Sequence, residues 1–520
     1  MTPPLSLFSS EAARLLEDGY DLDTEQRVRY TYWPVSFFLG DPTVISNAPL
    51  PLSGVKFSEQ LKGVGELRAS LQLADPDVRE MNPWELILPR KTGIVVVRSV
   101  LDEEENTEAH QAVWFGVVWA RTPVPATGRW EIIARTIEYN WSRRLITGPM
   151  NGGDLVWAQE DRTTIVGDLL TPSLFSQLGP ADNLGTATAV TGGTTTTFVA
   201  GNTDALDVAV GSYVTILDST GQRRQSALGD VAFRVTGKVA AANTTITFTP
   251  ALTVATAVGD LMTAGPLFPG WITVDKPTAM TGRLHDMSYK RDQQTNLLTA
   301  HVDRSNVDDG YDWRTTVRVL DGDSAIDAAS YRVQYVMGYP RLGRSWDEAD
   351  DEVPRFVFRA SGEGNVISVT QVYDGSAVSN AVWGQGAGYD DTALRQLATN
   401  QADWANGFLI TESRYSNPDV KLSDTLLDYT IAALVQSYAN EQFITGLTVR
   451  GDKPPYFDTY TLGDDALFTT DDWTNPDGPS GDRDYTSLTR IMGWVVTPPE
   501  GTAAETVQLV VGVGTAVDGG

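Results

Sequence analysis

Short runs in which apolar and polar residues alternate dominate the chain between Val55 and Thr147. Alternation with a period of two is typical of half-buried strands, and Gly, Pro and acidic turns separate the runs. The pattern predicts a small antiparallel β-barrel over about 26–150. In chain order its main segments read VKFSEQLKGVGELRASLQLADPDV, PRKTGIVVVRSV, AVWFGVVWART and RWEIIARTIEYNWSRRLIT.

Helical signals are few in the first part of the chain. Ser10 can cap a short docking helix over about 11–18, and Gly19 would end it. The polar stretch WAQEDRTTIVGDLL predicts a helical connector within 151–182. Two of its apolar residues share one face at a spacing of four, Ile165 and Leu169.

Two further helices are predicted in the last third. One would be capped by Asp391 and ended by Gly407, and it would carry Leu394, Leu397 and Trp404. The strongest helical pattern begins at Ser423 or Asp424 and runs to about Gln442. Its apolar stripe consists of Leu427, Ile431, Leu434, Val435 and Tyr438, so we expect a core helix.

The segment 183–265 differs in composition from its surroundings, because it is rich in Thr, Ala, Gly and Val and poor in aromatic residues. A pattern in it occurs twice. TTTTF followed by ALDVAVGSYVTI is echoed by TTITF followed by ALTVATAVGDLMTA. The echo predicts a small β-module of two similar hairpins, and we interpret it as an insertion on the outer surface.

Composition limits the classes of function. The 520 residues are too many for one core, so several domains are expected. The absence of Cys excludes disulfides and Cys-ligated metals. The net charge of -28 disfavours binding to nucleic acid through phosphate neutralisation. The first residues lack the pattern of a signal peptide, and no apolar run reaches the ~20 residues of a membrane span.

Motifs for catalysis are missing from the sequence. The three histidines, His110, His285 and His301, have no zinc-binding spacing, and a solvated or structural setting is favoured for each. There is no G-x-S-x-G elbow, P-loop or dinucleotide fingerprint, and GQGAG at Gly384–Gly388 is interpreted as a tight turn. With 67 acidic residues, carboxylate pairs are inevitable and carry no signal. We therefore expect no catalytic, cofactor-binding or metal residues.

Two binding alternatives stay open. The acidic loops at 303–309, 347–352 and 471–484 could ligate calcium, but none fits the EF-hand template, and solvated or interface loops are favoured. Seven tryptophans could stack on sugars, although at strand and helix spacing a core or interface role is favoured. They are Trp114, Trp119, Trp130, Trp141, Trp383, Trp404 and Trp494.

Several segments in order resemble one family. In the first barrel they are FSEQLKGVGELRASLQL, ADPDV, PRKTG, VWFGVVW and RRLIT. Further on they are GYDWR, YPRLGR, AVWGQGAG and the R-I-x-G-W ending of SLTRIMGW. In this order the segments are similar to those of the minor tail proteins of long-tailed actinobacterial phages, a family taken to form the trimeric baseplate hub. The resemblance covers most of the chain outside 183–265.

The resemblance implies a mainly β, multidomain fold with a few helices. It would contain two tube-like antiparallel β-barrels, α+β connecting domains and the inserted β-module. Hub proteins of contractile phages are understood to have two such barrels, so three subunits present six to the tail tube. The expected divisions are 1–25 (docking helix), 26–150 (first barrel), 151–182 (connector), 183–265 (module), 266–345 (α+β domain), 346–422 (hairpin and helix) and 423–520 (core helix and last barrel).

The implied function is structural and not enzymatic. A homotrimer in the virion's tail tip, assembled in the host cytoplasm, would couple the tail tube to the tip. Its partners would be the distal tail ring protein, the tape-measure protein and tip or fibre proteins, with no membrane partner and no cofactor. An acidic channel would repel phosphates, so double-stranded DNA would pass without specific binding. The rival hypotheses are a receptor-binding or carbohydrate-binding tail protein and a cell-wall hydrolase, for which no catalytic pair is seen.

Overall fold

The computed structural model describes most of the chain, and no helix in the described ranges is long and apolar enough to cross a membrane. The predicted helix over 11–18 lies outside them. The described residues are 25–36, 42–101, 107–146, 155–170, 186–201, 213–219, 224, 233–240, 242–264, 272–275, 281–282, 284–289, 295–307, 310–319, 331–346, 356–360, 364–373, 375–388, 392–418, 420–438, 442–470 and 485–513.

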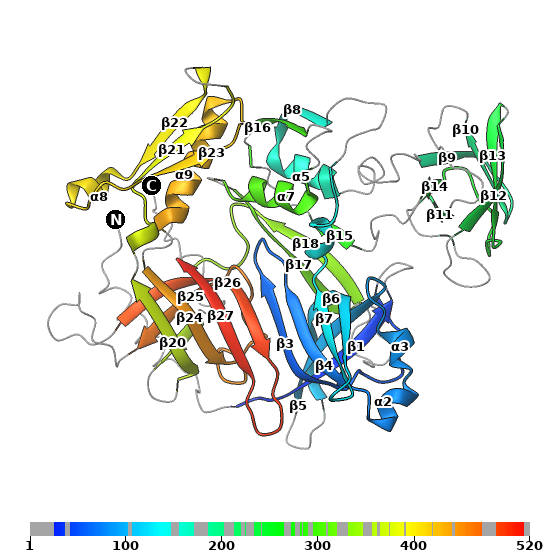
Figure 1. Ribbon diagram of the computed structural model, residues 1–520, viewed down its shortest axis with the longest axis horizontal. Helices are drawn as coiled ribbons and strands as arrows, with labels where there is room; N and C mark the ends of the chain where they lie inside the picture. Colours follow the sequence, from blue (N-terminus) through cyan, green and yellow to red (C-terminus); the bar gives the residue numbers. More distant parts are fainter. Residues whose placement is uncertain are drawn as a thin grey trace.

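A sheet of 13 strands contains both strand-rich ends of the chain (Figure 1). Its first half, blue to cyan, comprises in sheet order β2 (Thr43–Val44), β1 (Arg27–Ser36), β5 (Thr92–Leu101), β6 (Thr107–Val124), β7 (Arg129–Arg135), β4 (Glu66–Gln72) and β3 (Leu52–Gln60). Its second half continues through β26 (Tyr485–Thr497), β27 (Thr506–Val513), β24 (Gln442–Arg450) and β20 (Val366–Tyr373). On β26 it also carries β25 (Asp465–Thr470), which pairs with β19 (Phe356–Arg359).

The two halves are joined by one short antiparallel ladder between β3 and β26. It has four residue pairs, of which Glu59 with Trp494 and Phe57 with Val496 matter most here. Phe57 and Val496 are fully buried and belong to one hydrophobic core that runs through both halves. The chain's two ends therefore share a core rather than forming independent domains.

This arrangement corrects the prediction of two separate tube-like barrels. Among the described strands, β3 pairs with β26 and not with β1, so neither half closes on itself. The apolar faces of the halves are buried against each other, which takes the place of closure. The prediction of a mainly β chain with a few helices is confirmed.

Strand β5 is buried on both faces, which explains its unbroken IVVV run. Ile94 and Val96 point into the shared core, whereas Val95 and Val97 point into a second core. That second core lies between the first half and a sheet of β15 (Ile272–Asp275), β18 (Tyr331–Gly338) and β17 (Asp312–Val319). It also receives α4 (Glu138–Trp141), α5 (Arg162–Leu170) and α7 (Leu297–Ser305).

The smaller elements support this frame. Helix α5 confirms the second part of the predicted connector helix, and its Ile165 is fully buried. The prediction is wrong for the first part, 157–161, because these residues lie in strand β8 (Leu155–Asp161). Strand β8 precedes α5 and pairs with β16 (Leu284–Tyr289). The ADPDV turn opens α2 (Pro76–Glu80), because the Asp75 side chain accepts the backbone N–H of Asp77 at 3.0 Å. Helix α3 (Pro83–Leu86) follows it.

Six strands between residues 186 and 264 close into a separate barrel, at the right of Figure 1. They fall within the segment that the sequence sets apart. The strands are β9 (Thr186–Thr191), β10 (Thr197–Gly201), β11 (Tyr213–Leu217), β12 (Phe233–Ala240), β13 (Asn243–Thr249) and β14 (Leu261–Ala264). The barrel has its own apolar core, which includes Phe198, Ile216, Phe233 and Phe248.

The predicted pair of similar hairpins is wrong in its pairing. The repeated Thr-rich strands β10 and β13 pair with each other, and so do the second strands of the two copies, β11 and β14. Exchanging β9, β10 and β11 with β12, β13 and β14 leaves every pairing unchanged. The two copies interleave because closure leaves no exposed strand edge, whereas two separate hairpins would leave four.

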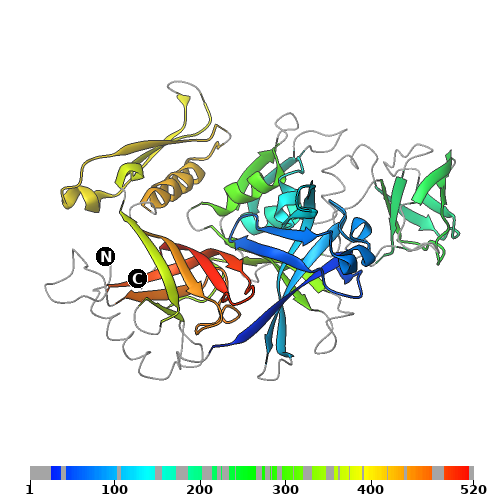
Figure 2. The same ribbon diagram turned by 60° about the horizontal axis from the view of Figure 1, so that its bottom comes forward.

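A small layer of three strands and a helix projects at the upper left of Figure 1 and of Figure 2. Its sheet consists of β22 (Arg395–Thr399), β21 (Ala381–Gln385) and β23 (Glu412–Ser416), preceded by the short helix η3 (Gly375–Ala377). Helix α9 (Ser423–Tyr438) packs on β21 and β22 and confirms the predicted start of the helix. The predicted apolar stripe is wrong at Val435, which is 62% exposed, whereas Leu434 is buried as expected. The other buried positions in the described part of the helix are Leu426 and Thr430, because these face the sheet.

The predicted helix before Gly407 is wrong for most of its length. Residues Arg395–Thr399 form a strand that pairs with β21, and only α8 (Gln401–Ala405) is helical. Asn400 caps α8, and Gly407, at a φ of +87°, follows it. Asp391 lies outside the described residues. Cross-strand pairing with β21 outweighs the helical spacing here, and it buries Ala398 while Leu397 stays 42% exposed.

A buried ion pair also holds the two halves together. The Arg98 guanidinium of β5 donates to both carboxylate oxygens of Glu505, at 3.0 Å each, and to Asp458 at 2.8 Å. The side chains of Arg98 and Glu505 are only 1% and 0% exposed. Tyr30 of β1 donates to the same Glu505 carboxylate. The first half thus contributes Arg98 and Tyr30, and the second half contributes the two acids.

Replacing Arg98 by Met should destabilise the joined sheet by about 3–5 kcal/mol, because Glu505 would stay buried without its partner. The measurement is the free energy of unfolding by chemical denaturation. Arg129→Met is the matched control, since the pair of Arg129 with Glu131 is exposed and is worth about 0–1 kcal/mol. Equal unfolding midpoints for the two variants would show that the buried pair does not hold the halves.

Candidate functional site at the junction of the two halves

The segments that resemble the phage family meet where the halves join. The carboxylate of Asp312, from GYDWR, accepts a hydrogen bond from the guanidinium of Arg490 in the R-I-x-G-W segment. The ammonium of Lys62, in the FSEQLKG segment, lies 3.1 Å from the same carboxylate. Burial opposes ionisation of Asp312, but Lys62 and Arg490 outweigh it and hold its pKa below the usual range. The carboxylate is therefore charged, and it ties strand β17 to both halves of the large sheet.

The YPRLGR turn makes the next two contacts. Arg341 binds Asp465 through two hydrogen bonds of 2.9 and 2.7 Å, and Arg344 lies 2.6 Å from Asp464. The carboxylates of Asp464 and Asp465 are 0% and 1% exposed. The backbone N–H of Leu342 also donates to Asp312 at 2.9 Å. Segments far apart in the sequence thus form one network of buried ion pairs.

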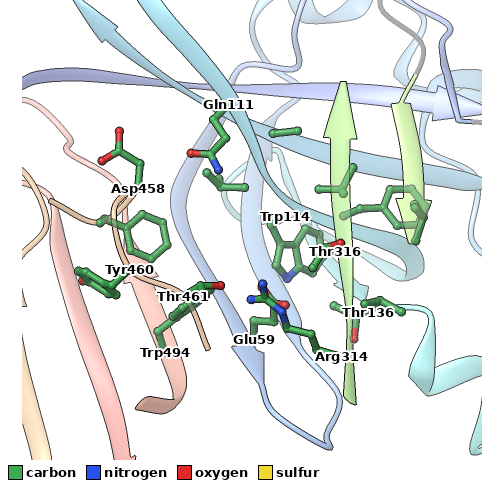
Figure 3. Close-up of a pocket in the computed structure, with 17 residues that line it drawn as sticks. Glu59, Gln111, Trp114, Thr136, Arg314, Thr316, Asp458, Tyr460, Thr461 and Trp494 are labelled. Atoms are coloured by element: carbon green, nitrogen blue, oxygen red, sulfur yellow. The ribbon is translucent and has the colours of Figure 1, made fainter. Parts of the chain in front are cut away.

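A cavity of about 140 Å³ lies beside this network, over the β3–β26 ladder (Figure 3). Glu59 and Trp114 line it from the first half, and Arg314 of β17 faces them. The second half contributes five of the remaining lining residues, Phe457, Asp458, Tyr460, Thr461 and Trp494. Glu59 and Trp494 are cross-strand partners in the ladder, so both side chains lie on the same face of the sheet.

Glu59 is the most perturbed acid of the cavity. Burial raises its pKa to about 7, with nearby Glu138 adding to the rise and Arg314 opposing it. Burial likewise raises the pKa of Glu138, which accepts a hydrogen bond from Thr315. Glu59 therefore exchanges its proton near neutral pH, at the joint between the halves.

Sequence reasoning did not single out Glu59, although a signal was present. Its neighbours on the same face of the strand, Phe57 and Leu61, are buried at 0% and 3% exposure. An acid between two buried apolar positions of an alternating strand indicates a polar group held against a core. Arg98 and Glu505 carry no comparable signal, because their pairing depends on how distant strands meet.

The histidines do not form a site among the described residues. His301 is buried in an aromatic cluster, with its ring centroid 4.4 Å from that of Trp313 and its Nε2 hydrogen-bonded to Tyr335. Burial, with Arg304 and Lys62 nearby, lowers its pKa to about 3, so the ring is neutral at physiological pH. His110 lies on β6, partly exposed. The side chain of His285 lies outside the described residues.

Most of the tryptophans that could bind sugars are buried. Trp114, Trp130, Trp141 and Trp494 are at most 6% exposed, and Trp119 packs edge-on against Tyr139 at 4.7 Å. Only Trp383 and Trp404 are exposed, at 45% and 36%, and both lie in the projecting layer. The seven tryptophans therefore do not form one exposed surface on which sugars could stack.

The remaining candidates give no metal site in the described part of the chain, where no group of three or more acidic or histidine side chains could hold an ion. The acidic loops at 347–352 and 471–484 lie outside the described residues, as do Asp308 and Asp309. The GQGAG segment ends strand β21 and turns at Gly388, with a φ of +108°. This agrees with its interpretation as a turn.

No family model and no curated protein matches the sequence. In structure, the chain is similar at low identity to phage tail proteins. A tail protein from Neisseria meningitidis MC58 is 8% identical, with 93% of this chain and 96% of that chain covered and a TM-score of 0.44. The 43 kDa tail protein of prophage MuSo2 from Shewanella oneidensis is 9% identical, with 93% and 98% covered and a TM-score of 0.44.

A third such structure, prophage tail protein gp18 from Listeria monocytogenes EGD-e, is 11% identical, with 92% and 94% covered and a TM-score of 0.40. At identities and TM-scores this low, the similarity assigns no function. The function has to be argued from the residues of this chain.

Glu59→Gln should make the protein's stability less dependent on pH. A carboxyl whose folded pKa is about 7, above the usual ~4.3, stabilises the fold most below its unfolded pKa. That contribution is lost as the pH rises through 7. The neutral variant should therefore match the parent at about pH 4 and exceed it by about 1–3 kcal/mol at about pH 8, as measured by chemical denaturation.

The matched control is Glu131→Gln, at a side chain that is 52% exposed. The difference in unfolding free energy between this variant and the parent should be the same at both pH values. If Glu59→Gln behaves like this control, Glu59 ionises as an ordinary surface acid and is not held in the cavity as described.

Proposed function

We propose that the protein is a structural subunit of a phage tail, and that three copies form the tail-tip or baseplate hub. In this role it couples the tail tube to the tip and forms part of the conduit for DNA. The role needs no catalytic group or cofactor, and it needs two sheet surfaces per subunit held in a fixed relation.

One observation carries the proposal. The segments of the family resemblance, GYDWR, YPRLGR, FSEQLKG and R-I-x-G-W, converge through buried ion pairs on the junction of the halves. Residues that fix the relation between two sheet halves are what a symmetric coupler requires. With two halves per subunit, three subunits would present six similar surfaces to a sixfold tube.

The ends of the large sheet suggest how copies would meet. Among the described strands, β20 pairs only with β24, and β2 is a two-residue strand at the opposite end of the sheet order. Strand β19 is a third edge among the described strands, since it pairs only with β25. A subunit can close a ring by joining two of these edges, β20 and β2, to its neighbours, which would leave neither of the two exposed. The net charge of -28 suits a channel wall that repels DNA phosphates.

The proposed partners follow from the position in the tail. They are the distal tail ring protein above, the end of the tape-measure protein in the channel, and tip or fibre proteins below. The contacts with DNA would be transient and unspecific. The subunit would be assembled in the host cytoplasm and work in the virion.

The purified protein is expected to form a trimer with a central opening. Ile367→Lys tests the proposed edge, since Ile367 is 53% exposed on β20 and a lysine on an edge strand blocks pairing with another chain. The variant should sediment as a folded monomer, and its melting temperature should fall because the stabilisation by association is lost. Cryo-EM of the tail tip should show three copies around an acidic channel.

Val510→Lys is the matched control, because Val510 is 46% exposed on β27, which has strands on both sides. It should remain trimeric. A wild-type protein that is strictly monomeric, with no density at the tail tip, would overturn the proposed function. Loss of the trimer in both variants alike would overturn only the assignment of the β20 edge.

Deleting 183–265 should leave the trimer and the tail intact and reduce adsorption to host cells. Thr186 and Thr263 are cross-strand partners, so the two ends of the barrel lie next to each other and a short Gly/Ser linker can replace it. Sedimentation of the deleted protein and adsorption of phage carrying it are the measurements. Collapse of the tail would show that the barrel is part of the hub itself.

A further inference from the structure

The cavity at the junction has more hydrogen-bonding capacity than the protein uses. Four buried polar atoms on its lining residues have no partner within the part of the chain that the structure describes, namely Trp494 Nε1, Tyr460 Oη, Glu59 Oε1 and Asp458 Oδ1. Trp494 and Tyr460 are themselves only 5% and 3% exposed. Buried polar groups normally have partners, because leaving them unpaired costs free energy. The four residues line one cavity, Glu59 from the first half and the other three from the second half.

The position of Asp458 is fixed by the buried pair that joins the halves. Its Oδ2 accepts a hydrogen bond of 2.8 Å from the guanidinium of Arg98, so Oδ1 is the oxygen without a partner among the described residues. Its side chain is 24% exposed, and the neighbouring Gln111 is exposed, so the cavity is open to solvent on this side. A small molecule could therefore enter beside Asp458.

The lining selects for a neutral ligand with several hydroxyl groups. An indole N–H only donates, a carboxylate only accepts, and a hydroxyl on the ligand can satisfy both kinds. Phe457, Tyr460 and Trp494 contact one another edge-on, with centroids 5.3 to 6.5 Å apart, and add an apolar wall. An anion would meet Glu59 and Asp458, and a cation would meet Arg314, so neither is favoured.

The volume limits the ligand to one ring. A cavity of roughly 150 Å³ accepts a molecule the size of benzene. The cavity here, about 140 Å³, is of that size, so a hexose, which has twice as many heavy atoms as benzene, fits only with its outer hydroxyls in the opening beside Asp458. A chain of sugars is too large. Pockets for drug-sized ligands are larger, on the order of 300–1,000 Å³.

We propose that this cavity is a binding site for one neutral cyclic polyol, such as a single sugar ring, held between the two halves of the sheet. Its hydroxyls bond to Trp494, Tyr460, Glu59 and Asp458, and its C–H face packs on the aromatic wall. The site does not depend on the hub assignment, because all of its groups belong to one chain. A ligand bound there contacts both halves and stabilises the closed junction.

The test is titration of the full-length protein with four probes, D-glucose, D-galactose, N-acetyl-D-glucosamine and myo-inositol. Binding is followed by saturation-transfer NMR and by the shift in melting temperature. We expect saturable binding of at least one probe. Trp494→Phe keeps an aromatic ring but removes the N–H, and it should weaken binding by roughly tenfold, as should Tyr460→Phe.

Trp383→Phe is the matched control, since the Trp383 indole donates to Glu412 outside the cavity, at 2.9 Å. It should bind the probe as the parent does. Should Trp494→Phe fail to fold, Tyr460→Phe decides the matter, because it removes only a hydroxyl. Failure of all four probes to bind the parent protein would leave the cavity as a hydrated space and overturn the proposal.

Equal affinity in the parent, Trp494→Phe and Tyr460→Phe would also overturn it, because binding would then lie elsewhere. Glucose 6-phosphate serves as a charged comparison, and tighter binding of this anion than of glucose would contradict the neutral class. The oligomeric state of the parent protein is recorded in the same samples. Loss of sugar binding and absence of a trimer are thus separate results.

Discussion

The structure depends on the buried pairing of Arg98 with Glu505, together with the ion pairs around Asp312. The β3–β26 ladder has only four residue pairs, which is little to hold two large groups of strands in one orientation. Buried ion pairs restrict the relative orientation of the halves as well as contributing energy, because the planar guanidinium of arginine binds a carboxylate in few geometries. Hydrophobic burial favours contact between the halves, and the buried ion pairs are satisfied only in the observed orientation, because removing one partner would leave a buried charge unpaired.

The local elements could be predicted from the sequence wherever one face of a strand or helix is buried. The alternation in RWEIIAR gives β7, and the stripe from Leu427 to Leu434 gives α9. The large-scale pairing could not be predicted, because an alternating strand such as β3 does not specify which strand lies beside it. The same lack of long-range information explains the wrong helix at Leu397, where pairing with Trp383 on β21 decides the outcome.

The candidate site was predicted only in part. The segments of the family resemblance were found from the sequence, but their meeting place was not, because Asp312, Arg341 and Arg490 lie far apart along the chain. Glu59 could have been noticed as an acid within an apolar face. Tyr460 and Asp458 could not, since they lie between strands, where no periodicity identifies buried positions. Side chains that act through distant partners have no local signature.

The interleaving of the two copies in the small barrel has a consequence for its folding and its origin. Each copy supplies three strands. Within a copy only one pair of strands is bonded, β9 with β10 in the first copy and β12 with β13 in the second, and every other pairing joins the two copies. The first copy to be synthesised therefore cannot complete its strand pairing until the second copy has been synthesised. Two single copies on separate chains would satisfy the same pairings, so an ancestral homodimer of one such unit, later fused, accounts for the present arrangement.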